Sequence, residues 1–527
     1  MLSVESIAEK VASYHKTADL DLLRRAYEFG LRAHEGQRRK SGEPYYLHPV
    51  QVASIIADLK LDVPSICAAF LHDTVEDTSA TIEEIERLFG KEISEIVDGV
   101  TKLSKIEFSS KEVRQAENFR KMIVAMARDI RVLLVKLADR THNMRTLEHM
   151  SQVKQERIAQ ETIDIYAPLA NRLGIQWMKV ELEDLSFRYL NPEAYEGISN
   201  KLEMTRAERE AYIAETTQIL KRELDAYQIN CEVLGRPKHI FSIYKKMRDR
   251  HAEDLDQLHD LLAFRIIVPA APQCYVALGV VHNLWTPLPE RFKDYIAVPK
   301  ANHYRSLHTA VIAKDGERVE VQIRTQEMHQ VAENGIAAHW VYKEGRTAPQ
   351  STDQQKFAWL RQLMEWQTEL TDPTEFMQTV KVDLFGDEIY VFTPKGDVHA
   401  LPVDATPVDF AFAIHTKVGE RTVGAKVNGR IVPLRHALKN GDIVEILTST
   451  TRKPSKDWLD FVVTSRARAK IRHAVRMEER ERARKRSASR YWTRRCALSS
   501  SPFTNCRRPS ASRSSCAAYT CRAPTKC

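Results

Sequence analysis

The chain has 527 residues, more than one hydrophobic core usually holds, so we expect two to four domains. It is 43% hydrophobic and 28% charged, which is typical of globular proteins. No apolar run reaches the roughly 18 residues that a membrane-spanning helix needs, so a membrane partner is not expected. The N-terminus shows no basic stretch followed by an apolar one, which favours a cytoplasmic location over secretion.

The net charge of +8 is concentrated at the C-terminal end of the chain. Residues 466–527 contain 18 Lys or Arg against 3 Glu, so the remainder is net negative. Any unspecific attraction to RNA therefore belongs mainly to this last segment. Cys67, Cys231 and Cys274 lie in the body of the chain without paired spacing, which indicates reduced thiols rather than a disulfide framework.

Residues 1–195 are expected to form an all-α domain. Apolar residues recur three and four positions apart in residues 65–71, 82–89 and 131–147. Thr81 is a candidate helix N-cap, and Gly90 stands where the same helix should end.

Residues 196–345 are expected to form a mixed α/β domain, followed by a linker helix in residues 346–381. Short β-branched or aromatic runs occupy residues 260–268, 291–300 and 318–325, and a helical pattern separates them.

Residues 382–449 predict a small β-grasp domain. One hairpin should turn at Lys395-Gly396-Asp397 and another at Asn428-Gly429. Residues 450–485 begin a helical domain, whereas residues 486–527 are rich in Ser, Arg, Cys, Thr and Pro and are expected to be disordered. We interpret this tail as the product of a frameshift. The predicted fold class is thus a multidomain α and α+β protein.

A first chemical motif is FLHDTVEDT, which should place His72 with Glu76, and Asp73 with Asp77, on one face of a helix. Taken alone, this pattern also fits a helix end with solvated carboxylates. His48 upstream, and Asp139 one turn before Asn143 downstream, add further ligand types. Imidazole and carboxylate together suit Mn²⁺ or a similar divalent ion with open positions for water, which is a hydrolase arrangement.

The segments QRRKSGEPYYLHP, FLHDTVEDT, DGVTKLSKI, AENFRKM and LADRTHNMRTL resemble the HD-type hydrolase domain of the Rel/Spo family of bifunctional (p)ppGpp synthetase/hydrolases. The resemblance implies removal of the 3′-pyrophosphate from (p)ppGpp. Carried over by position, it implies that His48, His72, Asp73 and Asp139 bind Mn²⁺, that Glu76 and Asp77 orient and activate water, that Arg39 and Lys40 grip the nucleotide, and that Asn143 lines its pocket. An exposed basic turn is the alternative for Arg39 and Lys40.

A second motif is GRPKHIFSIYKKM, which presents Arg236, Lys238, Ser242 and Lys246 around a turn and the start of a helix. A helix N-terminus there would also favour phosphate, although a solvated basic face is the alternative. Asp260 and Glu320 lie on separate apolar strands, where an unpaired charge is costly. Mg²⁺ coordination would explain both carboxylates.

This region resembles the Rel/Spo synthetase domain through GRPKHIFSIYKKM, DLLAFRIIV, RFKDYIAVPKANHYRSLHT, VEVQIRT and HQVAENGIAAHW. The implied reaction transfers pyrophosphate from ATP to the 3′-hydroxyl of GTP or GDP and releases AMP. The resemblance implies that Asp260 and Glu320 bind Mg²⁺, that Glu320 helps to deprotonate the 3′-hydroxyl, that Arg236, Lys238, Ser242, Lys246 and Lys293 contact ATP, and that Lys300, Asn302, Tyr304 and His308 face the guanine nucleotide.

Two local features refine this expectation. Residues 291–294 read RFKD, the basic form that the family's bifunctional members carry. The family commonly has NGYQS where this chain has His303 and Arg305 in NHYRS, which puts acceptor preference and synthetic rate in question.

Residues 389–434 resemble the family's TGS domain, which implies sensing of deacylated tRNA on the ribosome. His415 lies at the motif position associated with the 3′ end of the tRNA. A plain β-grasp scaffold is the alternative. Three interpretations follow for the chain: a bifunctional enzyme, which we favour; a hydrolase-dominant enzyme with a weak synthetase; or a ribosome- or tRNA-binding regulator with vestigial catalytic domains.

Overall fold

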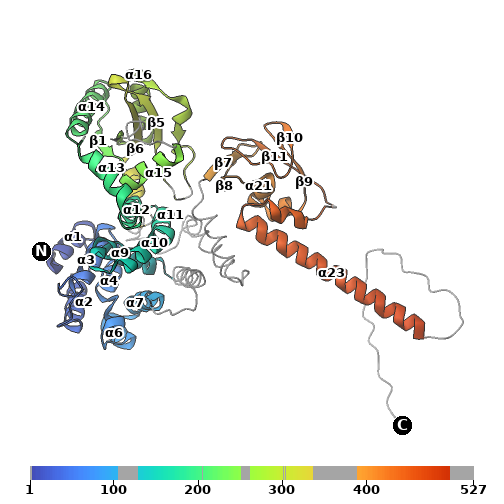
Figure 1. Ribbon diagram of the computed structural model, residues 1–527, viewed down its shortest axis with the longest axis horizontal. Coiled ribbons are helices and arrows are strands. Elements are labelled where there is room, and N and C mark those ends of the chain that lie inside the picture. The colour runs from blue at the N-terminus through green and yellow to red at the C-terminus, as the bar shows by residue number, and fades with distance from the viewer. Residues whose placement is uncertain are drawn as a thin grey trace, which may run out of the picture.

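The structure is a computed structural model that describes residues 3–104, 129–204, 206–250, 262–300, 302, 304–335, 337, 388–450 and 452–498. Three folded units follow one another along the chain, and one long helix leaves the third (Figure 1). Within these ranges, no helix combines the length and apolar character needed to cross a membrane. The linker helix expected at 346–381 and the tail beyond residue 498 lie outside the described residues.

The first unit is all-α, as predicted. The helix α4 (Val63–Leu71) lies at its centre and is buried along almost its whole length. The surrounding helices are α1 (Val4–Tyr14), α2 (Leu20–Ala33), α3 (Leu47–Asp58), α5 (Thr74–Asp77), α6 (Ile82–Phe89), α7 (Lys91–Ser104), α9 (Ile130–Arg145), η1 (Leu147–His149), α10 (Gln152–Glu161), the π-helix η2 (Thr162–Tyr166), α11 (Ala167–Arg172) and α12 (Gln176–Leu190).

The His72-Asp73 motif does not lie on one continuous helix, which corrects the sequence prediction. Helix α4 ends at Leu71 and α5 begins at Thr74, so His72 and Asp73 occupy the turn between them. The Nδ1 atom of His72 lies 2.7 Å from the carbonyl oxygen of Ala69, the group that a continuing helix would offer to the Asp73 N–H. The His72 side chain thus competes with the backbone for this carbonyl at the point where the helix ends.

Helix α12 belongs to both the first and the second unit. Its first half contributes Met178 and Leu182 to the core of the first unit. Its second half packs Phe187 against Ile198 and Ile243 of the second unit. The break at Asn191-Pro192 separates α12 from α13 (Pro192–Met204), as expected. The two units are therefore joined through one shared helix.

The second unit is built on a mixed sheet with the strand order β1-β2-β6-β5-β3, and β4 pairs with β5. Only β2 and β6 are parallel; the other neighbouring strands are antiparallel. The apolar face packs against α16 and α14. The elements are α14 (Arg206–Ala226), β1 (Glu232–Pro237), α15 (Ile240–Arg250), β2 (Leu262–Val268), α16 (Ala271–Leu284), β3 (Thr286–Pro287), η4 (Pro289–Arg291), β4 (Lys293–Asp294), β5 (Leu307–Ile312), η5 (Lys314–Gly316), β6 (Arg318–Thr325) and α17 (Gln326–Asn334).

The run over residues 291–300 is a strand only at Lys293 and Asp294, which corrects the longer strand predicted there. The Asp294 carboxylate accepts hydrogen bonds from the N–H groups of Ile296 and Ala297, at 2.9 and 2.8 Å. Such a side-chain turn diverts the backbone from the sheet although the following residues are apolar.

The third unit has the predicted β-grasp hairpins. Gly396 turns the first at φ 92°, and Asn428 and Gly429 turn the second at φ 51° and 80°. Two consecutive positive φ values are typical of a tight type I′ turn. The elements are β7 (Glu388–Phe392), β8 (Val398–Pro402), α21 (Pro407–Ile414), α22 (Thr416–Glu420), β9 (Thr422–Val427), β10 (Arg430–Val432), β11 (Val444–Thr448) and η7 (Lys456–Asp460).

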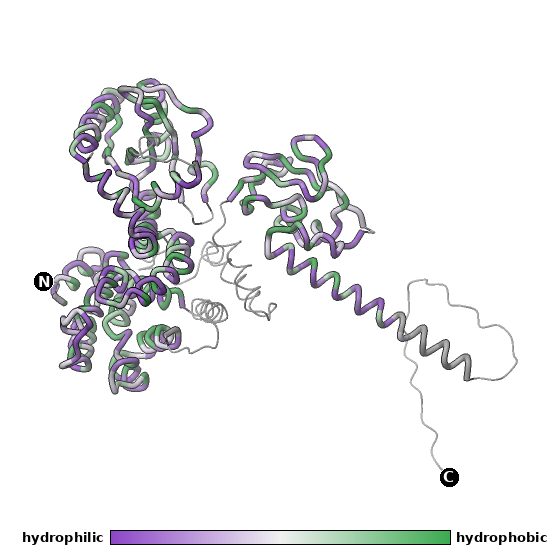
Figure 2. The backbone as a smooth tube through the Cα atoms, in the orientation of Figure 1, coloured by the Kyte–Doolittle hydropathy of each residue, from purple (hydrophilic) through white to green (hydrophobic). Residues whose placement is uncertain are grey.

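The long helix α23 (Ser465–Leu498) continues through residues 486–498, where the sequence predicted disorder. That stretch contains no Gly or Pro, so nothing in its backbone chemistry ends a helix before Pro502. Hydrophilic residues recur along the helix, which projects away from the β-grasp unit (Figures 1 and 2).

A buried aspartate joins this helix to the β-grasp unit. Asp409 is fully buried and accepts hydrogen bonds from the backbone N–H groups of Thr406, Val463 and Thr464. The hydroxyls of Thr406 and Thr464 also donate to it. Because its charge is satisfied entirely by these donors, Asp409 is a structural carboxylate.

Candidate active sites

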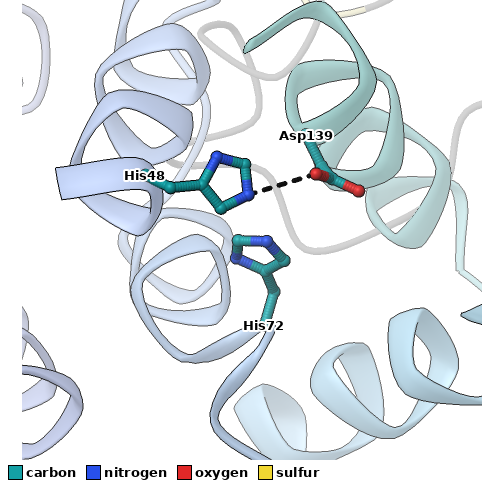
Figure 3. Close-up of side chains that lie close together, drawn as sticks. All are labelled: His48, His72 and Asp139. Carbon is teal, nitrogen blue, oxygen red and sulfur yellow. Dashed lines mark ion pairs between the residues drawn. The ribbon is translucent and has the colours of Figure 1, made fainter. Parts of the chain in front are cut away.

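Three helical segments of the first unit bring His48, His72 and Asp139 together (Figure 3). Their ligand-type atoms all lie within 4.8 Å of one another, and all three side chains are buried. His48 Nε2 lies 3.2 Å from Asp139 Oδ1. Segments far apart in the sequence, α3, the α4–α5 turn and α9, thus converge on one point.

Asp73 lies beside the same imidazoles. Its carboxylate oxygens are 3.2 Å from His72 Nε2 and 3.5 Å from His48 Nε2. The hydroxyl of Tyr45 lies 3.0 Å from Asp73 and also hydrogen-bonds to Asp77, so it connects the cluster to α5. Glu76 is on the same short helix and is half-buried.

The charges of the cluster are strongly coupled. Burial acts to lower the pKa of His72, but the carboxylates of Asp73 and Asp139 outweigh it and raise the pKa to about 9. Burial acts against ionisation of Asp139, yet Lys136, 2.7 Å away, and the imidazoles hold its pKa well below the usual range. Both aspartates are therefore ionised and able to accept a cation.

The nucleotide residues predicted from the sequence lie next to this cluster. The Arg39 guanidinium donates to Asn143 Oδ1 at 2.7 Å, and the Asn143 amide donates in turn to Asp139. Lys40 is exposed in the adjacent turn. Arg39, a cation that can bind phosphate, is thus linked to the Asp139 carboxylate through two hydrogen bonds by way of Asn143.

The donor set suits a divalent metal ion. Two imidazole nitrogens and two carboxylates are ligands that such ions accept. His72 Nε2 is buried without a hydrogen bond of good geometry, and its Nδ1 is already engaged by Ala69, so Nε2 is left aimed at the cluster. A buried polar atom in this state indicates a missing partner.

The second unit has an open cavity of about 260 Å³ on its polar sheet face. Glu320 forms part of one wall, and basic side chains form much of the rest. The lining residues are Lys246, Leu288, Arg291, Lys293, Tyr295, Lys300, His308, Thr309, Ala310, Arg318, Val319 and Glu320.

Glu320 is the acidic centre of this cavity. His308 Nδ1 lies 3.5 Å from its carboxylate and Lys238 Nζ lies 3.6 Å away. Burial acts to raise its pKa, but hydrogen bonds from His308 and Gln322 and the charge of Lys238 hold it well below the usual range. The Tyr304 hydroxyl lies 2.8 Å from His308 Nε2, which completes a line from Tyr304 to Glu320.

Several predicted residues are not brought into this cavity. The Arg236 guanidinium donates to His239 Nε2 at 2.7 Å. The Asn302 amide instead donates to the Asn171 carbonyl of the first unit, at 3.2 Å. Ser242 lies on α15 outside the lining, and Arg305 is exposed. Asp260 and His303 lie outside the described residues.

The N-terminus of α15 was expected to favour phosphate, and in the structure a side chain already engages one of its backbone donors. The carboxylate of Asp184, from α12, accepts a hydrogen bond from the Phe241 N–H at 2.9 Å. A negative side chain thus already occupies the end of the helix that would attract an anion.

Sequence reasoning missed residues that complete both sites. His142 contacts His48, and Tyr45 contacts Asp73. Both lie in the quoted motifs, each three residues from a predicted ligand. Arg318 and Tyr295 also line the cavity, but no sequence signal apart from the motifs next to them marks these two residues.

In the third unit, exposed His415 caps α22 by accepting from the Lys417 N–H at 3.1 Å.

Three domain models match the chain in order: the HD domain over residues 26–176, the region found in RelA / SpoT proteins over residues 235–347, and the TGS domain over residues 389–448. The fold and sites therefore define an HD-domain protein joined to a mixed α/β domain and a TGS module. The chain is 48% identical over 481 residues to the bifunctional (p)ppGpp synthase/hydrolase SpoT of Escherichia coli K12, covering 91% of this chain and 68% of that protein. The chain belongs to the RelA/SpoT family.

Other relatives are similar over the same region. A GTP pyrophosphokinase of Myxococcus xanthus is 61% identical over 476 residues, which cover 90% of this chain. The chain spans 63% of that protein, and 57% and 62% of relatives from Streptomyces coelicolor and Synechocystis. A solved structure, described as a metazoan ortholog of SpoT that hydrolyzes ppGpp, is 27% identical with a TM-score of 0.26 and covers 32% of this chain and 94% of that chain.

Proposed function

We propose that this chain is a bifunctional alarmone enzyme of the stringent response. It transfers pyrophosphate from ATP to the 3′-hydroxyl of GTP or GDP, and it removes the 3′-pyrophosphate of (p)ppGpp. One observation carries the proposal: the chain holds a buried imidazole–carboxylate cluster beside Arg39, and separately an open basic cavity around Glu320. The named activities of its relatives agree with both halves.

In the hydrolase site, His48, His72, Asp73 and Asp139 hold Mn²⁺. When bound, the ion supplies Lewis acidity and lowers the pKa of a coordinated water. Glu76 and Asp77 orient the attacking water and take its proton, with Asp77 fixed by the Tyr45 hydroxyl. Arg39 and Lys40 bind the phosphates, and Asn143 lines the nucleotide pocket. The bond between the 3′-oxygen and phosphorus breaks, which leaves GDP or GTP and pyrophosphate.

In the synthetase site, the cations position ATP and neutralise its phosphates, which is the main requirement of phosphoryl-type transfer. Lys246 and Lys293 face the cavity from α15 and β4. Glu320 accepts the proton of the 3′-hydroxyl as its oxygen attacks the β-phosphorus, and AMP leaves. Asp260 and Glu320 would hold Mg²⁺, while Arg236, Lys238 and Ser242 contribute to ATP binding.

The guanine nucleotide binds beside Lys300, Asn302, Tyr304 and His308. Lys300 Nζ lies 5.5 Å from the centre of the Tyr304 ring. A guanine base at Tyr304 would therefore lie next to the charge of Lys300. In the TGS domain, exposed His415 contacts the 3′ end of deacylated tRNA on the ribosome. We place the protein in the cytoplasm.

Paired nucleotide assays on the whole chain test the proposal. ATP with GTP or GDP and Mg²⁺ measures synthesis, and ppGpp with Mn²⁺ measures hydrolysis, each repeated with Asp73→Ala and Glu320→Ala. We expect Asp73→Ala to remove only hydrolysis and Glu320→Ala only synthesis. Glu317→Ala, an exposed acid just before β6, is the matched control and should change neither.

Two results would contradict the proposal. A wild-type chain that hydrolyses ppGpp but never synthesises it would support the hydrolase-dominant interpretation. A chain that does neither and still binds tRNA would support the regulator interpretation.

A further inference from the structure

His142 lies directly behind His48 and has no role in the proposed chemistry. The two side chains meet Nδ1 to Nδ1 at 2.8 Å, and their ring centres are 4.9 Å apart. His142 is buried on α9, three residues after Asp139. The His142 ring therefore contacts His48, and it does so from α9, the helix that also carries Asp139.

A hydrogen bond between two imidazole nitrogens leaves open which ring donates. The guanidinium of Arg39 decides the direction here. Its Nη1 lies 3.4 Å from the same Nδ1 of His142, and a guanidinium can only donate. A hydrogen bond from Arg39 requires a lone pair on His142 Nδ1, so we assign the hydrogen to His48 Nδ1, which donates it to His142.

This direction fixes the chemistry of the other His48 nitrogen. A neutral imidazole with its hydrogen on Nδ1 has a lone pair on Nε2. His48 Nε2 is the atom that faces the cluster, 3.2 Å from Asp139 and 3.5 Å from Asp73. The contact with His142 therefore presents His48 in the tautomer that can bind a metal ion.

His72 is oriented by a different contact. Its Nδ1 bonds to the backbone carbonyl of Ala69 at 2.7 Å, which leaves its Nε2 directed at the cluster. A backbone carbonyl cannot be removed by substitution, whereas an imidazole can. Of the two histidines, only His48 has an orienting partner that a single mutation can delete.

We propose that His142 is a positioning residue, which accepts the Nδ1 hydrogen of His48 and so holds Nε2 of His48 toward the divalent ion. The inference rests on the proposed hydrolase site and deepens it. Because Arg39 bonds to the same nitrogen, the cation that binds nucleotide and the orientation of a metal ligand share one contact. Loss of such an outer partner typically costs about 10–100-fold in metal affinity.

Mn²⁺ binding to the whole chain tests this directly, with free Mn²⁺ measured by electron paramagnetic resonance during titration. His142→Asn places an amide oxygen close to the position of Nδ1, so it keeps the acceptor. His142→Gln carries the amide one methylene farther, and His142→Leu has no acceptor. We expect affinity within about 3-fold of wild type for His142→Asn, and a loss of about 10–100-fold for His142→Gln and His142→Leu.

Controls separate positioning from damage to the fold. His149→Leu, a half-exposed histidine just after the same helix, should bind Mn²⁺ like wild type. Synthesis of (p)ppGpp should persist in every variant. Hydrolysis by His142→Leu should recover toward the wild-type rate at saturating Mn²⁺, since the lost function is affinity and not proton transfer.

Equal affinities for His142→Asn, His142→Gln and His142→Leu would overturn the inference, whether all remain tight or all become weak. If His142→Leu does not fold, the Asn and Gln variants decide the matter alone. Failure of the proposed site itself has a different signature: wild type and His48→Ala would then bind Mn²⁺ equally poorly, and the inference would fall with the site.

Discussion

The first and second units differ in how far their central carboxylates are buried. In the first unit, Asp139 is almost fully buried, with a side chain 6% exposed, and neighbours on α3 and α9 engage both carboxylate oxygens. In the second unit, Glu320 is 28% exposed and faces an open cavity of about 260 Å³. The first site is a compact buried cluster, and the second is an open cavity.

This difference teaches how each site tolerates change. A buried cluster gains strong electrostatic interactions from its low dielectric surroundings, but each group depends on the others for satisfaction. An open cavity lined by several cations holds a large polyanion through many screened contacts, so each contact matters less. Single substitutions should therefore be severe in the first unit, whereas substitutions of the cations that line the cavity of the second unit should have graded effects.

The largest effect is expected for Asp139→Asn. The amide keeps the shape of the carboxylate but removes the charge that His48 and Lys136 face. Hydrolysis of ppGpp should fall by about 10³-fold, the upper range for loss of one preorganised electrostatic group. Synthesis, measured with ATP and GTP on the same preparation, should stay within about 2-fold. A comparable loss of synthesis would show that the two sites are not separate.

Burial alone should not make an aspartate catalytic, and Asp409→Ala tests this. Asp409 is as buried as Asp139 but is satisfied by donors from residues 406, 463 and 464. Its loss leaves buried N–H groups unpaired, which costs about 3 kcal/mol. Amide exchange in residues 460–470 should become about 100-fold faster, since 1.4 kcal/mol is a factor of ten. Both basal activities should be unchanged; their loss would mean that the α23 joint supports the catalytic units.

The sequence predicted the cluster better than its supports. His48, His72 and Asp139 could be found because their residue types are metal ligands and their motifs are short. His142 and Tyr45 lie in the same motifs, but their roles could not be assigned, because these depend on contacts across 94 and 28 residues of sequence. Local pattern carries ligand identity, whereas orientation comes from tertiary packing.

The same reasoning explains the errors in secondary structure. The two β-grasp hairpins were predicted because Gly and Asn at positive φ mark the turns locally. The break between α4 and α5 was missed because a side chain, that of His72, competes for a backbone carbonyl. The capped end of α15 was missed because Asp184 reaches it from 57 residues upstream.

The two units should also respond differently to pH when divalent ions are removed by a chelator. Burial acts to lower the pKa of His72, but Asp73 and Asp139 raise it to about 9. This value exceeds the pKa of about 6.5 in the unfolded chain. Its stabilisation is complete below pH 6.5 and is lost as the pH rises toward 9. In the second unit, burial and Arg236 lower the pKa of His239 to about 4, so its contribution is complete above 6.5 and is lost on acidification.

Between pH 6.5 and 9 the metal-free first unit should therefore lose about 2–3 kcal/mol of local stability, and the second should not. Amide exchange, corrected for the intrinsic rate at each pH, measures this in α4 and α9 against β2 and β6. Saturating Mn²⁺ should abolish the difference, because the ion replaces the proton on His72. Equal protection of α4 at both pH values without metal would contradict the expectation.

The smallest effect is expected for Arg318→Met, set against Lys136→Met. Arg318 is an exposed cation that lines the cavity, so solvent screens its pull on ATP and neighbouring cations share its task. The KM for ATP should rise by only about 3–5-fold, corresponding to the roughly 0.5–1 kcal/mol of an exposed charge contact. Lys136 is a largely buried cation, 15% exposed and 2.7 Å from Asp139, and its loss should lower hydrolysis by about 10–100-fold. Raising the salt concentration should narrow the Arg318→Met effect and leave that of Lys136→Met in place, because a buried pair is screened much less. Equal losses in the two variants would show that exposure does not govern how the two sites tolerate change.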